Sequence, residues 1–250
     1  TNLICSNNQL TSLDVSSTAL TELICYGNAL DSLDVSSNTA LTELYCSSNQ
    51  LTSLDVSSNT ALISLFCGSN ELTSLDVSSN TALTDLRCNS SNLDSLDVSS
   101  NTALTILQCA PNNLTSLDVS NNTALTTLHC FGNQLTSLDV SANSALTRLK
   151  CNSNELTSLD VSANTALIHL NSSDNNLDSL DVSNHTALTW LECQANELTY
   201  LNMRNGITDA LTNFNATNND SLECIETLDP DYATANWTYE NGNIDDGVTF

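Results

Sequence analysis

Apolar residues recur along this chain with a period of 21 residues, and each period contains two stretches in which apolar and variable positions alternate. The line LTELYCSSNQLTSLDVSSNTA at 41–61 returns as LISLFCGSNELTSLDVSSNTA at 62–82. Its first half, L-x-x-L-x-C-x-x-N-x-L, alternates as a β-strand does, and L-x-x-L-D-V-S-x-N-T-A repeats the alternation more weakly. Since no stretch carries a helical pattern of ten residues, we expect coils of two short extended segments joined by two turns.

Cysteine marks the phase of the repeat. From Cys25 to Cys151 a cysteine stands every 21 residues, Ser172 takes the next place and Cys193 the one after. Only the first interval, from Cys5 to Cys25, is 20 residues long. A period of this length indicates a solenoid, in which each coil is stable only against its neighbours. We expect about ten coils over residues 1–219, the first one truncated, and a C-terminal cap over residues 220–250.

This pattern resembles the leucine-rich repeat superfamily, and specifically its short bacterial 21-residue class with a cysteine ladder, as in the cysteine-ladder internalin. The nested L-x-x-L-x-C-x-x-N-x-L-x-x-L-D-[VL]-x-x-N pattern runs from about residue 3 to residue 219. The tail NDSLECIETLDPDYATANW resembles the C-terminal cap of secreted leucine-rich repeat proteins of Bacteroidetes. The resemblance implies a β-rich solenoid, a right-handed superhelix with a parallel sheet on its concave face and little or no α-helix. It also implies an extracellular protein, secreted or attached to the cell surface, but no particular ligand.

Charge narrows the range of partners. The chain has a formal net charge of −25, with 4 Lys and Arg against 29 Asp and Glu. Nucleic acid and anionic membranes reward Lys and Arg, so we expect neither as a partner. No stretch has the apolar length of a membrane span, so we also expect no membrane insertion. We expect the chain to be a monomer.

The cysteine column takes an inward place beside leucines such as Leu44 and Leu65. Ten cysteines in a secreted chain would ordinarily suggest disulfides. Thiols stacked in register have poor geometry for a disulfide, and evenly spaced thiols do not converge on a tetrahedral zinc ion. We therefore expect free buried thiols that act as small apolar groups, and we expect no metal and no other cofactor.

Two columns of Asn mark the turns of the coils. An Asn amide can bond backbone groups of its own coil and of the adjacent one, so we interpret both columns as structural. The first column consists of Asn49, Asn70, Asn112, Asn133, Asn154, Asn175 and Asn196, with Ser91 as its exception. The second consists of Asn38, Asn59, Asn80, Asn101, Asn122, Asn143 and Asn164, with His185 as its exception.

A column of Asp raises an electrostatic question. Carboxylates at about 5 Å spacing repel their neighbours by roughly 1 kcal/mol each, even in water. Hydrogen bonds from the Ser residues that follow, such as Ser57 and Ser58 after Asp55, would offset this repulsion, and so would bound Ca²⁺. We favour the hydrogen bonds, because the glycine-rich spacing of calcium loops is missing. The column is Asp14, Asp34, Asp55, Asp76, Asp97, Asp118, Asp139, Asp160 and Asp181.

Residue variety is confined to three columns beside the inward Leu and Cys of the first segment. Arg148 and Lys150 stand on either side of Leu149, so both should point outward from one strand. Three of the four cations, two of the three His and five aromatics lie in these columns, while other exposed columns repeat Ser, Thr, Asn and Asp. Aromatics with Arg are typical of interface centres, so we predict a ligand-binding surface. Its residues are Tyr26, Tyr45, Phe66, Arg87, His129, Phe131, Arg148, Lys150, His169 and Trp190.

The predicted function is an extracellular, non-enzymatic binding or adhesion module of a bacterium that recognises a protein or a glycan through this surface. No Ser or Cys nucleophile is tied to a base by any motif, and Glu22 and Glu43 would lie on an open sheet and not in a cleft. Three alternatives stay open: drift at exposed positions, a structural spacer without a specific ligand, and an ice-binding solenoid. The last rests on a regular column of Thr39, Thr60, Thr81 and Thr102.

Overall fold

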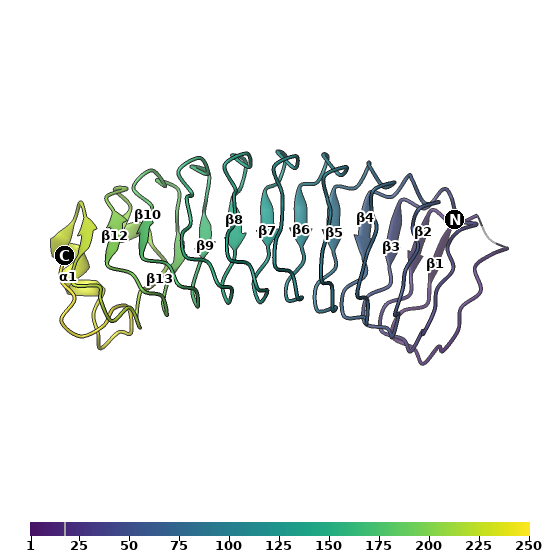
Figure 1. Cartoon of the computed structure of the whole chain (residues 1–250), viewed down its shortest axis with the longest axis horizontal. Helices are drawn as coiled ribbons and strands as arrows, with labels where there is room; N and C mark the ends of the chain where they lie inside the picture. Colours follow the sequence, from purple (N-terminus) through teal and green to yellow (C-terminus); the bar gives the residue numbers. More distant parts are fainter. Residues whose placement is uncertain (18) are drawn as a thin grey trace. The chain divides into compact units, whose positions relative to one another are not determined.

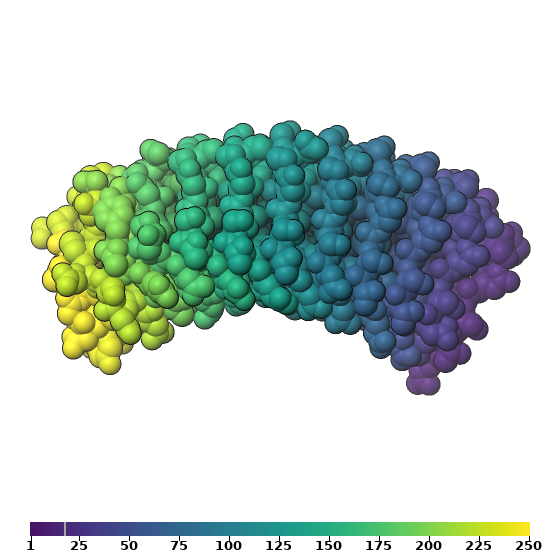
Figure 2. Space-filling view, in the orientation of Figure 1, coloured from purple at the N-terminus to yellow at the C-terminus, as the bar shows by residue number. Residues whose placement is uncertain are grey.

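A computed structural model describes residues 1–17 and 19–250 of the chain, which divides into two compact units, 1–125 and 126–250. Each unit is a stack of coils whose short strands form a parallel sheet (Figure 1). Successive coils of a unit pack directly against each other (Figure 2). In register, Leu44 lies between Leu23 and Leu65. The predicted β-rich solenoid with parallel strands and almost no helix is confirmed.

The strands of each unit are only three residues long in nearly every coil, as the alternation predicts. The first unit contains, in sheet order, β1 (Asn2–Ile4), β2 (Glu22–Ile24), β3 (Glu43–Tyr45), β4 (Ser64–Phe66), β5 (Asp85–Arg87) and β6 (Ile106–Gln108). The main sheet of the second unit contains β7 (Thr127–His129), β8 (Arg148–Lys150), β9 (His169–Asn171), β11 (Trp190–Glu192) and β13 (Asn213–Asn215). A smaller sheet there contains β10 (Ser179–Asp181), β12 (Tyr200–Met203) and β14 (Ile225–Thr227).

Among the residues that the structure describes, helix is limited to two short elements of the second unit, η1 (Thr208–Ala210) and α1 (Pro230–Asn236). Asp229 caps α1 by accepting a hydrogen bond from the Tyr232 N–H at 3.0 Å, and Pro230 occupies the first turn. Within the part of the chain that the structure describes, neither element has the length and apolarity that a membrane span requires.

The second extended segment of the repeat differs from the expectation. Among the described residues it pairs as a strand only in β10, β12 and β14, whereas earlier coils leave it outside any ladder. Side chains bond backbone groups of this segment in the unpaired coils and in the coil of β10 alike. The Asp55 carboxylate accepts from the Ser57 N–H at 2.9 Å, and the Asn80 amide donates to the Val56 carbonyl at 3.0 Å.

Columns of Leu, Val and Cys fill the inside of each unit. In one representative coil Leu65, Cys67, Leu72 and Val77 are all 0% exposed. A buried aliphatic side chain of this size stabilises a fold by roughly 1.5–3 kcal/mol. Because one apolar side of every coil is covered only by its neighbours, the stack is the unit of stability.

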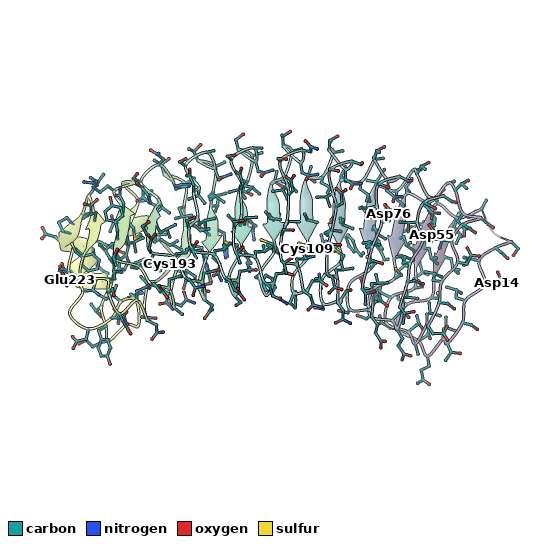
Figure 3. All side chains as sticks on the ribbon, in the orientation of Figure 1. Asp14, Asp55, Asp76, Cys109, Cys193 and Glu223 are labelled. Carbon is teal, nitrogen blue, oxygen red and sulfur yellow. The ribbon has the colours of Figure 1, made fainter. Side chains whose placement is uncertain are left out.

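The cysteine ladder lies within this core. From Cys25 to Cys193 its cysteines are buried, as predicted, while Cys5 is half-buried and Cys224, which lies beyond the ladder, is exposed. Cys109 and Cys193 are labelled in Figure 3. Burial raises the pKa of the Cys109 thiol to about 12, so the group is protonated and unreactive near neutral pH. A buried neutral thiol acts as a small apolar group.

The first Asn column holds the turn after each strand, as predicted. Asn70 donates to the Cys67 carbonyl of its own coil at 2.9 Å and to the Cys46 carbonyl of the preceding coil at 3.1 Å. Its side-chain oxygen accepts from the Leu51 N–H at 3.0 Å. The preceding Ser69 has φ +53°, a left-handed conformation that costs a residue other than glycine roughly 1–2 kcal/mol. Three amide hydrogen bonds offset this strain.

The second Asn column joins coils on the other side. Asn101 donates to the Val77 and Asn80 carbonyls of the preceding coil, both at 2.9 Å. Its exception, His185, is 1% exposed and places Nε2 3.1 Å from the Val161 carbonyl. An imidazole N–H thus replaces the Asn amide in the same hydrogen bond. The structural role predicted for both columns is confirmed.

The C-terminal tail covers the last coil of the second unit. The centroid of the Trp237 ring lies 4.4 Å from that of Phe214, a residue of β13, and 5.9 Å from that of Phe250. The Asp245 carboxylate accepts from the Asn219 N–H at 2.8 Å. These contacts bury apolar side chains that a last coil would otherwise expose.

Candidate binding surface

The variable columns flank a buried leucine on each strand, which sets the direction of their side chains. In β8, Leu149 is buried, Arg148 is exposed and Lys150 is half-buried. Because neighbouring residues of a strand point to opposite faces, both cations lie on the outer face of the sheet. We call the first and third residues of these strands the variable surface.

The third predicted column, the residue after each Cys, contributes to this surface only in part. Tyr26 is exposed and Phe131 is half-buried, but Gly68, Ala110 and Ser173 are buried. The coil closes tightly there, because a Cβ atom on Gly68 would lie 2.5 Å from the carbonyl oxygen of Asn89. Neither Tyr26 nor Phe131 makes a ring contact with another described residue.

In the first unit, three predicted site residues on adjacent strands form a stack. The Tyr45 and Phe66 rings have centroids 4.5 Å apart and an interplanar angle of 31°. The Arg87 guanidinium lies over the Phe66 ring at 4.3 Å, a cation–π contact. Strand register places Tyr45 and Arg87 on either side of Phe66, so both faces of that ring are covered.

Carboxylates fix both ends of this stack. The Tyr45 hydroxyl donates to Glu43 at 2.7 Å, and burial together with this hydrogen bond raises the pKa of Tyr45 to about 12. Arg87 donates two hydrogen bonds to Asp85, at 3.0 Å and 2.9 Å, and this pairing raises the pKa of Arg87. Our prediction of the site did not include Glu43 or Asp85. Their position two residues before the partner, on the same face of the strand, is the signal that could have found them.

In the second unit, the predicted residues cluster around β8. Register aligns Arg148 with His169 and His169 with Trp190, and it aligns His129 with Lys150. The His169 and Trp190 rings are stacked, with centroids 5.1 Å apart and an interplanar angle of 17°. The sequence placed these residues on one face, and the structure brings them onto adjacent strands.

The two cations of β8 differ from the other two cations of the chain. Arg87 pairs with Asp85, and Arg204 pairs with Glu226 at 2.7 Å. Within residues 1–17 and 19–250, the side chains of Arg148 and Lys150 make no ion pair and no hydrogen bond. They are therefore open to an external anion.

The two cations of β8 act on the neighbouring His169. The pKa of His169 is lowered, first by burial and then by the charge of Lys150, with Arg148 acting in the same direction. Glu192 acts in the opposite direction, but this carboxylate already accepts a hydrogen bond from Asn213 at 3.2 Å. His169 is thus neutral near pH 7, and the charge of the cluster resides on Arg148 and Lys150.

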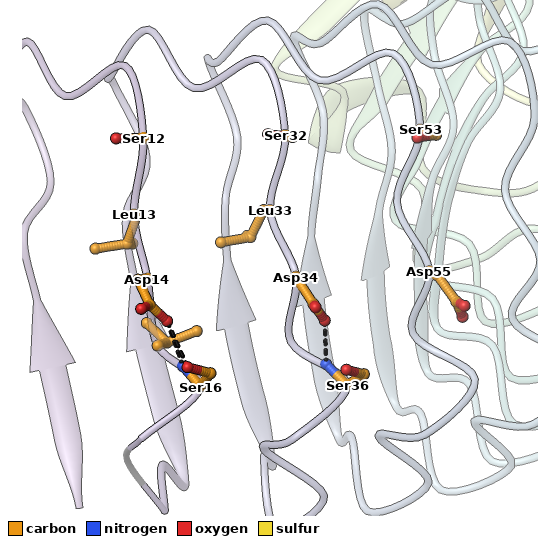
Figure 4. Close-up of a pocket in the computed structure, with 11 residues that line it drawn as sticks. Ser12, Leu13, Asp14, Ser16, Ser32, Leu33, Asp34, Ser36, Ser53 and Asp55 are labelled. Atoms are coloured by element: carbon orange, nitrogen blue, oxygen red, sulfur yellow. Dashed lines mark hydrogen bonds between the residues drawn. The ribbon is translucent and has the colours of Figure 1, made fainter.

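The Asp column lies on a different part of each coil. Ser16 and Ser36 donate backbone N–H groups to Asp14 and Asp34, each at 2.9 Å, along a groove in the first unit (Figure 4). Hydrogen bonds from the side chains of these Ser residues, and then these backbone bonds, lower the pKa values of Asp14 and Asp34, which confirms the hydrogen-bonding interpretation of the column. Among the described residues, no three His, Cys, Asp or Glu side chains are placed to hold a metal ion.

No protein-family model and no curated protein matches this chain, but solved structures do. The functional domain of InlJ from Listeria monocytogenes, which includes a cysteine ladder, is 41% identical to the chain with a TM-score of 0.84. The alignment covers 90% of this chain and 52% of that one. The chain is a leucine-rich repeat protein with a cysteine ladder. It spans about half the length of the InlJ structure.

Two more distant structures share the leucine-rich repeat fold. InlF, an internalin from Listeria monocytogenes, is 19% identical with a TM-score of 0.67, over 90% of this chain and 73% of its own. YopM, a leucine-rich effector protein from Yersinia pestis, is 23% identical with a TM-score of 0.71, over 90% of this chain and 65% of its own. At these identities the likeness is one of fold.

Proposed function

We propose that this leucine-rich repeat protein is a non-enzymatic binding module, secreted or attached to a cell surface, that recognises a protein through its variable surface. The observation that carries the proposal is confinement. Scarce cations and large aromatics occupy the outer positions of the strands, while the Asn, Asp, Leu and Cys columns repeat almost without change. The repeating columns are explained by hydrogen bonds and packing within the fold, and the variable positions are not.

Preorganisation supports a binding role. The stack of Tyr45, Phe66 and Arg87 is fixed at both ends by carboxylates, so little side-chain entropy would be lost when a partner covers it. Tyr and Arg are also among the residues that dominate binding energy at protein interfaces. Similarity to the functional domain of InlJ points the same way.

The similarity also favours a location outside the cell. The acidic surface fits this setting, since a net charge of −25 maintains solubility without a partner. Glu22 and Glu43 align on adjacent strands, but Glu43 already accepts a hydrogen bond from the Tyr45 hydroxyl at 2.7 Å, which does not favour a catalytic pair of carboxylates.

The test begins with a ligand search on the intact 250-residue chain, by protein pull-down and by glycan array. The ligand found is then titrated against a triple variant, Arg148→Ala, Lys150→Ala and Trp190→Ala. We expect a loss of at least roughly 2 kcal/mol of binding, about 30-fold in affinity, with a melting temperature near the parent's. Folding should survive because the three side chains lie outside the buried columns.

A matched control changes the other exposed side of the coils. Ser57, Ser78 and Ser99 are exposed, and replacing them with Ala preserves the backbone N–H groups that bond to the Asp column. This control should bind as the parent does. If the triple variant binds the ligand normally and the Ser variant does not, the binding site lies on the Ser side of the coils and not on the variable surface. If the chain binds nothing in either screen, the result favours the alternative function of a structural spacer without a specific ligand.

A further inference from the structure

We propose that β8 carries a site for an extended acidic peptide whose two carboxylates stand two residues apart; this deepens the proposed function and rests on it. Arg148 and Lys150 provide the two cations of the site. His129 and His169 flank them on the neighbouring strands.

Charge pairing at β8 differs from charge pairing at Arg87 and Arg204. A chain with 29 acidic residues has ample carboxylates to neutralise its 4 cations, and it does so for Arg87 and Arg204. At Arg148 and Lys150 it does not, because the residues aligned with them on β7 and β9 are Thr127, His129, His169 and Asn171. No carboxylate lies beside either cation in the register of the sheet. The unpaired positive charge on this face matches a ligand of opposite charge.

The spacing of the two cations matches an extended peptide. Arg148 and Lys150 are alternate residues of one strand, so their Cα atoms lie about 6.6 Å apart and both side chains point to the same side. An extended peptide has the same rise, and its alternate side chains also share a side. A Glu-x-Glu segment running along β8 therefore presents one carboxylate to each cation. Adjacent Glu residues, or Glu residues three apart, would point one carboxylate away.

Anionic sugars are the other ligands that such a surface could meet. A sugar ring packs on the open face of an aromatic ring, but one face of Trp190 is already stacked on His169 at 5.1 Å, and Phe131 is half-buried. In the first unit, Phe66 lies between Tyr45 and Arg87. A long sulfated or uronic chain would also carry many negative charges past a protein of net charge −25. A peptide with a local pair of carboxylates and little other charge avoids that repulsion.

The experiment measures the affinity of the full chain for fluorescent ten-residue peptides of equal composition. Their Glu residues are adjacent, two apart or three apart, and a Gln-x-Gln peptide serves as the uncharged probe. We expect the Glu-x-Glu peptide to bind at least tenfold more tightly than each of the others. Raising the salt concentration from about 50 mM to about 300 mM should weaken this binding, because exposed charges are screened.

Matched variants test the assignment to β8. Arg148→Gln with Lys150→Gln should abolish the preference for Glu-x-Glu, whereas Arg204→Gln, which removes a cation paired with Glu226, should leave it unchanged. Charge reversal, Arg148→Glu with Lys150→Glu, should transfer binding to a Lys-x-Lys peptide. Melting temperatures show that each variant is folded.

Three results would overturn the proposal: equal affinity for all spacings, equal loss with Arg204→Gln, or tighter binding of a sulfated or uronic oligosaccharide through Arg148 and Lys150. A protein partner found in the ligand search shows whether only the acidic-peptide site fails or the proposed binding function fails as well. If that partner still requires Trp190 or the Tyr45 stack while the peptides show no preference, the variable surface binds but its ligand is not an acidic peptide.

Discussion

Single side chains decide how well one coil fits on the next, and the cysteine column shows this most directly. Cys151 and Cys193 are 0% exposed, and so is Ser172, which occupies the same place between them. The Ser172 hydroxyl oxygen is buried and has no hydrogen-bond partner among the described residues. A buried unsatisfied hydroxyl costs a fold roughly 1–3 kcal/mol. Within the column, Ser172 therefore lacks the partner that the thiols of Cys151 and Cys193 have in the Asn171 and Asn215 carbonyls.

Replacing Ser172 with Cys should stabilise the protein. The change supplies a weakly polar thiol of the size that the column accommodates, so we expect a gain of about 1 kcal/mol in the free energy of unfolding, or about 2–4 °C in melting temperature. Cys151→Ser, the reverse change one coil earlier, should destabilise by a similar amount. Urea unfolding of both variants measures the effect. A less stable Ser172→Cys protein would show that the hydroxyl has a role in this coil.

The Asp column stabilises its coils through hydrogen bonds despite the repulsion between its charges. Hydrogen bonds from Ser78 lower the pKa of Asp76, and the nearby charges of Asp55 and Asp97 raise it by less. A carboxyl whose pKa is lower in the folded state than in the unfolded state contributes stability above its unfolded pKa, which is about 3.9. That contribution is lost as the pH falls through the lower folded pKa.

Two substitutions of Asp76 separate its hydrogen bond from its charge. Asp76→Asn retains an oxygen that can accept from the Ser78 N–H, so at pH 7 its melting temperature should stay near the parent's. Asp76→Ala removes the acceptor and should melt lower. As the pH rises from about 2 to about 4, the melting temperature of the parent should increase relative to that of Asp76→Asn. Above about pH 4 the difference between the two melting temperatures should stay constant. Equal melting temperatures for Asn and Ala would show that the hydrogen bond contributes nothing.

At the scale of elements, side chains complete what three-residue strands begin. Short strands offer few backbone hydrogen bonds, so the Asn amides join each coil to the one before it. In Asn101, both side-chain bonds reach the preceding coil, to Val77 and Asn80. The tail is the element that ends this series in the second unit, through α1 and the contacts of Trp237.

Removing the tail should expose the last coil. Without residues 222–250, Phe214 and the edge of β13 would lose their cover, and uncovered strand edges promote aggregation. We expect insoluble or oligomeric protein, measured by size-exclusion chromatography. Trp237→Ala, which opens a cavity between Phe214 and Phe250, should cost about 3–5 kcal/mol.

The control for this prediction is Tyr239→Ala, because Tyr239 lies in the same segment but is 61% exposed. It should cost little stability. A truncated chain that remains a well-folded monomer would show that the tail is a linker and not a cap.

At the scale of the whole molecule, net charge is the dominant property. A charge of −25 on 250 residues destabilises the compact state through self-repulsion, even though it maintains solubility. The cations are too few to offset it, and two of them face outward unpaired on β8. The molecule therefore depends on dissolved ions more than a neutral protein does.

Added salt should raise the melting temperature. Between about 20 mM and about 500 mM NaCl the Debye length shortens several-fold, which screens the repulsion between exposed carboxylates. We expect the melting temperature at pH 7, measured by circular dichroism, to rise by about 3 °C or more. At about pH 4, where many Glu side chains are protonated, the rise should be smaller. A melting temperature that falls with salt would mean that attractive ion pairs outweigh repulsion.

Much of the candidate site follows from the sequence, and some of it does not. The alternation around Leu149 predicts that Arg148 and Lys150 point outward, and the structure agrees. The sequence does not show that Arg87 is neutralised by Asp85 while Arg148 is unpaired. Asp85 stands two residues before Arg87 on the same face of β5, whereas no carboxylate stands in β8 or at the aligned positions of β7 and β9. The sequence offers these positions, but only the structure shows that the Arg87 and Asp85 side chains meet.

The sequence by itself determined the period, the inward and outward columns and the roles of Asn, Asp and Cys. A 21-residue repeat brings the same position of every coil into register, and alternation fixes which side chains are buried. Only the tertiary structure decided whether the second segment pairs, which rings stack and which cations are paired. These features depend on distances of a few ångströms between side chains of one coil or of neighbouring coils, and each coil presents a different set of residues there.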